Sequence, residues 1–98
     1  MHNRIDDTLN SYEWDPAKET VNRAMHGVAF LDAVEVPADP LAVTVRDDSG
    51  EEVRHATLGL DGLGRFLVVV WTWRDERARM ISARRATAAE RATLRWDT

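Results

Sequence analysis

Residues 66–71 read Phe-Leu-Val-Val-Val-Trp, and this uninterrupted apolar run decides the fold. Six apolar residues in a row, three of them β-branched, favour a strand that is buried on both faces. Alternating residues 41–46, a turn at 47–50 and residues 52–60 predict a hairpin that leads into this central strand. Residues 77–83 then predict a fourth strand. We therefore expect an antiparallel meander.

Helix signals lie on both sides of the meander. Asp15-Pro16 predicts a helix start, because the Asp side chain caps free N–H groups and Pro suits the first helical position. Gly27 predicts the end of that helix, and residues 31–36 predict a second, shorter one. Thr87 and Glu90 have the spacing of a capping box, which predicts a terminal helix reaching to about Trp96.

The first helix has two distinct faces. Ala17, Val21 and Ala24 form an apolar stripe. Lys18, Asn22 and His26 recur at four-residue spacing and share another face.

A short strand at 12–14, two helices, four strands and a last helix predict the α+β class, with a small antiparallel sheet flanked by helices. We expect one domain over residues 12–98, preceded by a flexible leader at 1–11 that is polar and lacks periodicity.

The chain has 98 residues and no cysteine, which excludes disulfides, a Cys-ligated zinc site and a thiolate nucleophile. The three histidines are too scattered to predict a metal site, and no cofactor motif is present. The longest apolar run is too short for a bilayer span and the first residues do not resemble a signal peptide, so we expect a cytoplasmic protein with no membrane contact.

Charge is uneven along the chain. The formal net charge is −4, yet residues 74–98 hold seven arginines against four acidic residues. Such polarity favours a positive face that binds phosphate, although a solvated Arg/Glu surface would have the same composition.

Several motifs occur together. They are Tyr12-Glu13-Trp14-Asp15-Pro16-Ala17-Lys18, Asn22, His26-Gly27-Val28-Ala29-Phe30, Ala33, Asp39-Pro40 and Ile81-Ser82-Ala83-Arg84-Arg85-Ala86-Thr87 with Glu90-Arg91. In these motifs the chain closely resembles the BrnT family of ribonuclease toxins, over nearly the whole domain. Met25, before His-Gly, and Leu94, after Glu-Arg, depart from the family pattern.

The resemblance implies a RelE-like microbial ribonuclease fold and an RNA-cleaving toxin of a type II toxin–antitoxin system that blocks translation and growth. It also implies a BrnA-like antitoxin partner with a DNA-binding domain, so that operator DNA is reached only through the antitoxin in a toxin–antitoxin complex.

RNA cleavage without a metal requires a proton acceptor, a proton donor and cations that stabilise charge on the phosphorane. His26 is the candidate proton carrier, because an unperturbed imidazole exchanges protons near neutral pH, but a helix-end His bonded to carbonyls is the structural alternative. Arg54, Arg79 and Arg84 are candidate catalytic phosphate ligands, with sheet-surface ion pairing as their alternative. Lys18, Asn22 and Arg85 are candidate substrate-binding residues.

Two other functions stay open. The first is a catalytically inactive RelE-like binding module that acts with its antitoxin as co-repressor of the operon. The departures from the family pattern at Met25 and Leu94 favour it. A small-ligand enzyme is the third possibility, and the lack of a cofactor motif opposes it. Trp71 and Trp73, on one side of the central strand, are expected in the core or in the antitoxin interface rather than in a base-stacking platform.

Overall fold

The computed structural model describes residues 12–93. The order of elements follows the expectation from the sequence, except that the second helix expected at 31–36 is divided into a short α-helix and a 3₁₀ helix. The elements are β1 (Tyr12–Glu13), α2 (Pro16–His26), α3 (Phe30–Ala33), the 3₁₀ helix η1 (Val36–Ala38), β2 (Val43–Asp47), β3 (Arg54–Leu60), β4 (Phe66–Arg74), β5 (Arg77–Arg85) and α4 (Ala88–Ala92). The expected leader at 1–11 and the end of the terminal helix lie outside the described residues.

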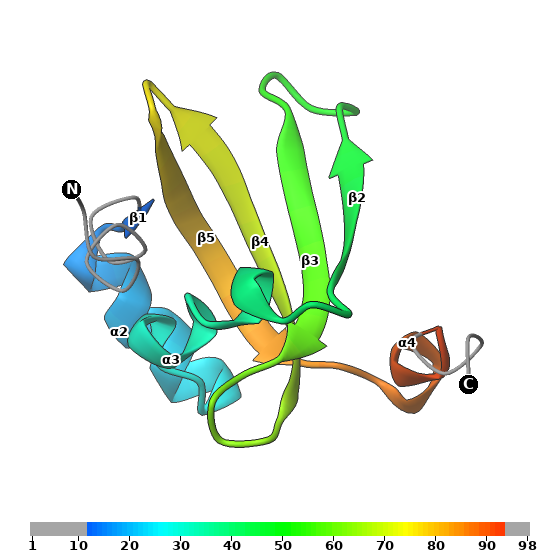
Figure 1. Cartoon of the computed structure of the whole chain (residues 1–98). Coiled ribbons are helices and arrows are strands. Elements are labelled where there is room, and N and C mark those ends of the chain that lie inside the picture. The colour runs from blue at the N-terminus through cyan, green and yellow to red at the C-terminus, as the bar shows by residue number, and fades with distance from the viewer. Residues whose placement is uncertain (1–11, 94–98) are drawn as a thin grey trace, which may run out of the picture.

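One five-stranded sheet organises the domain, with the strand order β1-β5-β4-β3-β2 (Figure 1). The four-strand meander is antiparallel, as predicted. The prediction of a wholly antiparallel sheet was wrong at β1, which pairs with β5 in parallel. A strand of two residues carries no sequence signal that identifies its partner. The result is a mixed sheet in an α+β domain.

The core lies on one face of the sheet. Leu67 and Val69 of β4 and Met80 and Ala83 of β5 are buried there. The segment after α2 covers them with Val28, Phe30, Ala33, Val34 and Val36. The fit of η1 against β3 is close, since a Cβ added at Gly59 would lie 3.1–3.2 Å from Ala42, Asp39 and Val36.

Helix α2 lies beside the outer edge of β5 (Figure 1). Its predicted ends are confirmed: the Asp15 side chain accepts a hydrogen bond from the Ala17 N–H, and Gly27 takes a left-handed conformation at the C-terminus. The apolar stripe of the helix does not face the core. Val21 is 58% exposed, and the one buried residue of the helix is Asn22.

A β-bulge in β5 determines which side chains share a face. Ser82 pairs with Val70 and Met80 pairs with Trp71, so Ile81 is an extra residue with no partner in β4. Strict alternation would place residues 79 and 84 on opposite faces. The extra residue reverses the alternation, and both lie on the face opposite the core.

Candidate functional site

The face of the sheet opposite α3 carries the arginines that the sequence singles out. From the strand register, Arg54 of β3, Thr72 of β4 and Arg79, Ser82 and Arg84 of β5 point to this side. We call these five side chains the arginine face.

One end of the arginine face is a row of polar side chains across the strands. On one side of Thr72, Arg79 of β5 is its direct partner. On the other side, Arg54 of β3 is level with Thr72, because the preceding pair in the register is His55 with Trp71. Two strand spacings place the Cα atoms of the two arginines about 10 Å apart, within the reach of two long side chains toward a common anion. This row can act as a phosphate clamp.

Glu13 closes the row on the β1 side. Its carboxylate lies 2.9 Å from the Arg79 guanidinium and 3.5 Å from that of Arg77. Arg77 also donates a hydrogen bond to the Tyr12 carbonyl, so these contacts fasten β1 to β5. The sequence analysis missed Glu13 as a functional residue, because the parallel partner of a two-residue strand cannot be read from a pattern.

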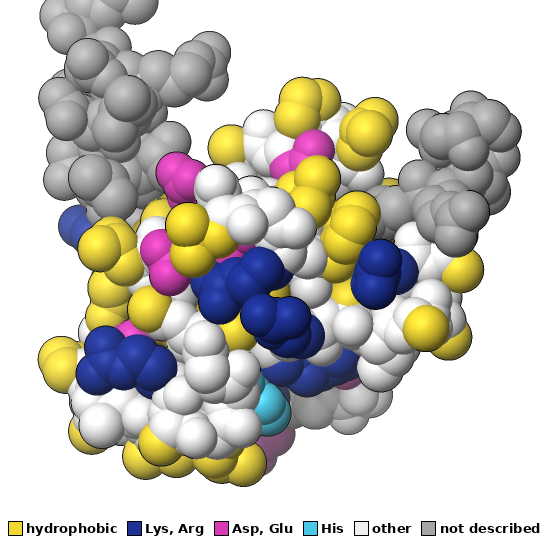
Figure 2. Space-filling view, turned by 90° about the horizontal axis from the view of Figure 1, so that it is seen from below, with side chains coloured by type: hydrophobic (Ala, Val, Ile, Leu, Met, Phe, Trp, Pro, Cys, Tyr) yellow, Lys and Arg dark blue, Asp and Glu magenta, His cyan; other side chains and the backbone are white. Residues whose placement is uncertain are grey.

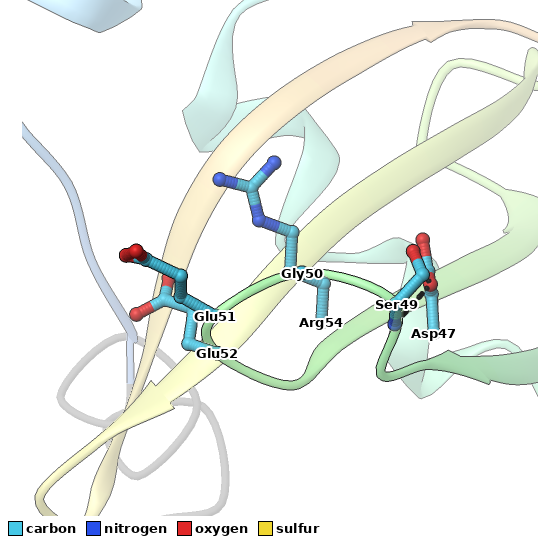
Figure 3. A pocket seen from close by; sticks show the side chains of 6 residues that line it. All are labelled: Asp47, Ser49, Gly50, Glu51, Glu52 and Arg54. Carbon is cyan, nitrogen blue, oxygen red and sulfur yellow. Dashed lines mark hydrogen bonds between the residues drawn. The ribbon is translucent and has the colours of Figure 1, made fainter.

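Arg54 lies beside an acidic pocket of about 590 Å³ formed by the β2–β3 loop. In Figure 3 its guanidinium and the carboxylates of Glu51 and Glu52 point in different directions, and the dashed lines join Ser49 to Asp47. Hydrogen bonds from the Ser49 hydroxyl and N–H lower the pKa of Asp47. The loop itself repels phosphate, so any phosphate bound by Arg54 would lie over the sheet.

Arg84 holds the terminal helix. Its guanidinium makes two parallel hydrogen bonds of 2.8 Å to the Glu90 carboxylate, and Glu90 also completes the predicted capping box with Thr87. The hydrogen bonds from Arg84 lower the pKa of Glu90 to about 2, and the same contact raises the pKa of Arg84. Arg84 is separated from Arg79 by about four strand residues, or about 13 Å. The two arginines therefore do not meet at a single phosphate.

Lys18 and His26 lie in a different place, an open groove of about 390 Å³ between α2 and β5. Val21 and Met25 line it on the helix side, and Ile81 and Ser82 on the strand side. Lys18 and His26 stand near opposite ends, eight residues or about 12 Å apart along the helix. Ser82 belongs both to this groove and to the arginine face, so the two surfaces adjoin.

Asn22 has a structural position. Its side-chain amide donates to the Val28 and Ala83 carbonyls at 3.3 and 2.8 Å and accepts from the Ala83 N–H at 3.1 Å. With both polar atoms bonded to the backbone and 6% of the residue exposed, the Asn22 amide joins α2 to β5. The substrate contact expected from the sequence stays a prediction.

Arg85 does not lie beside Arg84 on the arginine face. It pairs with Leu67, so it points to the opposite side of the sheet at the end of β5. Figure 2 looks onto the end of the molecule where β5 ends, and Lys and Arg side chains gather there. The Arg91 guanidinium of α4 lies 5.2 Å from the centre of the Phe66 ring at the start of β4.

The two tryptophans of β4 differ. Trp71 packs against the core, donates a hydrogen bond to the Thr57 hydroxyl at 2.9 Å and stacks on His55. Trp73 is 58% exposed, so it is not a core residue. His55 lies on the face opposite Arg54, as the alternation of the strand predicts.

Within residues 12–93 no three His, Asp or Glu side chains group as metal ligands would. No helix in that range is long and apolar enough to cross a membrane.

Comparisons with known proteins identify a matching family and a similar fold. Residues 14–90 match the family model described as the ribonuclease toxin BrnT of the type II toxin–antitoxin system. The fold is similar to the crystal structure of the Brucella abortus ribonuclease toxin BrnT, with a TM-score of 0.59 and 22% sequence identity over 76% of this chain and 92% of that one. No curated protein sequence matched the chain.

Proposed function

Because this chain belongs to the BrnT family of ribonuclease toxins, we propose that it is a metal-independent endoribonuclease whose RNA substrate lies across the arginine face. The observation that carries the proposal is the cross-strand row in which Arg54 and Arg79 stand on either side of Thr72, with Glu13 beside Arg79. Two guanidinium groups on one face within reach of a common point suit a phosphate, since each offers paired N–H donors and keeps its charge.

The reaction we propose is attack by a 2′-hydroxyl on its neighbouring phosphorus. The bond to the 5′ oxygen breaks and leaves a 2′,3′-cyclic phosphate and a 5′-hydroxyl. The attacking hydroxyl gives up its proton to a base, and the leaving oxygen takes one from water at this exposed face. Arg54 and Arg79 stabilise the extra negative charge of the phosphorane.

Glu13 is the proton acceptor in this proposal. A phosphate that binds Arg79 competes with the Glu13 carboxylate for the same guanidinium, which releases the carboxylate next to the reacting group. His26 is less suited to this step. Glu13 lies just before the start of α2, whereas His26 is the last of the 11 residues of this helix and lies about 15 Å along it from the first. Arg84 lies further along the face and contacts the RNA backbone at a second point.

The biological consequence we propose is loss of mRNA, and with it arrest of translation and growth. Membership of a toxin–antitoxin family implies an antitoxin partner. We further propose that this partner is BrnA-like, carries the DNA-binding domain of the complex and inhibits the toxin in the cytoplasm. A RelE-like ribonuclease fold is also part of the proposal. The open face of the sheet, opposite α3, supports it.

The test measures the rate at which the purified protein cleaves a defined RNA, first for the wild type and then for chosen variants. Arg54→Ala and Arg79→Ala should each lower the cleavage rate by about 100-fold, the usual effect of losing one charge-stabilising group. Arg46→Ala is the matched control: Arg46 is an exposed arginine paired with His55, so it points to the other face. Wild-type rates in both arginine-face variants would contradict the proposal.

Glu13→Gln separates the base from a structural contact. The amide oxygen still accepts a hydrogen bond from Arg79 and keeps β1 in place. The rate should fall by about 100-fold, as for loss of a general base, while RNA affinity is retained. The acid limb of the pH profile should also change. A variant that cleaves at the wild-type rate with the wild-type profile would exclude Glu13 as the base.

One observation favours a second function. Arg79 and Arg84, both candidate catalytic residues, are engaged in short ion pairs in the free chain. An inactive co-repressor needs no free cation at these positions. In that case the purified protein would leave RNA intact and would raise the affinity of its antitoxin for operator DNA.

A further inference from the structure

Helix α2 is attached to the sheet in an unusual way. Its buried contact is the amide of Asn22, while Val21 and Met25 are 58% and 72% exposed. An amphipathic helix of a monomeric domain ordinarily turns its apolar side chains inward. Here they line the open groove beside β5 instead.

The groove has the chemistry of a protein-binding site. Its middle is apolar, formed by Val21 and Met25 facing Ile81, and none of its lining residues is acidic. A cation and a histidine stand near its ends, Lys18 and His26. Two such groups about 12 Å apart offer little to an RNA backbone, whereas an apolar centre with a polar rim is typical of a protein interface.

We propose that this groove is the docking site of the antitoxin, and that it takes a segment with apolar side chains flanked by carboxylates. The proposal rests on the toxin function proposed above, which supplies the partner. Charge complementarity to Lys18 selects the acidic flank. Because Ser82 belongs to both the groove and the arginine face, a segment seated here lies directly beside Arg84 and obstructs the path of the RNA.

The experiment measures binding of the purified toxin to the BrnA-like antitoxin proposed above by titration calorimetry. Val21→Asp and Met25→Asp should each raise the Kd by about 10-fold or more, as loss of an interface anchor does, and Lys18→Glu should also weaken binding. Leu41→Asp and Leu63→Asp are the controls, since these residues are 61% and 69% exposed and lie outside the groove. They should leave the Kd unchanged.

The same variants are assayed for RNA cleavage without antitoxin. Val21→Asp and Met25→Asp should cleave at the wild-type rate and escape inhibition by the antitoxin. If they lose cleavage while remaining folded, the groove belongs to the RNA site and the docking proposal is overturned. Wild-type antitoxin affinity in the Val21→Asp Met25→Asp double variant overturns it as well.

Two outcomes separate the docking proposal from the ribonuclease proposal and from self-association. If the wild-type protein cleaves no RNA but the groove variants lose the antitoxin, the docking site is supported and the ribonuclease proposal fails. If the free wild-type protein is a dimer in solution and the groove variants are monomers, the occupant is a second copy and the antitoxin proposal is overturned.

Discussion

Asn22→Ala should be the most damaging single change on α2. The residue makes three hydrogen bonds to the backbone, two of them to Ala83. At about 1 kcal/mol net for each, the loss is about 3 kcal/mol, and more if the buried N–H and C=O groups stay unpaired. In a domain of this size that corresponds to a fall in Tm of roughly 12–24 °C.

Urea unfolding followed by tryptophan fluorescence measures this loss. Lys18→Ala is the matched control, because it removes an exposed side chain from the same helix and should change stability by less than about 0.5 kcal/mol. The m-value should be the same in all three proteins, so that the midpoint reports stability. A loss below about 1 kcal/mol for Asn22→Ala would refute the view that this amide joins the helix to the sheet.

The same variant decides between a structural and a substrate-binding Asn22. At a temperature where Asn22→Ala is fully folded, RNA cleavage should be close to that of the wild type. Loss of cleavage without loss of stability would restore the substrate contact expected from the sequence.

The remaining predictions concern the capping contact, a close packing contact and the RNA path. The pKa of Glu90 falls from 4.5 to about 2 on folding, so its contribution to stability is complete above about pH 4.5 and is lost as the pH falls toward 2. The difference in unfolding free energy between wild type and Glu90→Gln should therefore shrink over that window. A constant difference contradicts the assignment. Gly59→Ala should destabilise the protein by about 1–3 kcal/mol because the added methyl group overpacks η1, whereas Gly50→Ala, where the nearest atom is 4.0 Å away, should not. RNA affinity should depend on salt with a slope of about −0.7 for each phosphate bound, so Arg54→Ala should reduce the slope by about that amount and Arg46→Ala should leave it unchanged.

The sequence predicted those parts of the fold that local chemistry determines. The apolar run at 66–71 is the centre of β4, the Asp15 and Gly27 signals mark the ends of α2, and the Thr87–Glu90 capping box is formed. Each of these depends on residues close together in the chain, whose interactions a pattern can express.

The sequence did not predict features that depend on distant partners. Periodicity identified the two faces of α2 but not what each face meets, and Asn22, on the polar face, occupies the buried position. The parallel pairing of β1, and with it the contact between Glu13 and Arg79, joins residues 66 positions apart. The candidate arginines lie on one sheet but not on neighbouring strands, since β4 separates Arg54 on β3 from Arg79 and Arg84 on β5, and Arg85 falls on the side opposite Arg84.

The unpaired residue in β5 also constrains how the length of this strand can change. Deleting Ile81 would remove the bulge without changing any pairing, because Ser82 would then follow Met80 and still face Val70; Ala83 would stay in the core and Arg84 on the arginine face. Inserting one residue after Ser82, with the pairing up to Ser82 unchanged, would instead turn Ala83 outward and Arg84 toward the core side, and α4 would lose its ion-paired anchor. The side on which the chain presents its positive charge therefore tolerates loss of the bulge residue but not the gain of a further residue in this strand.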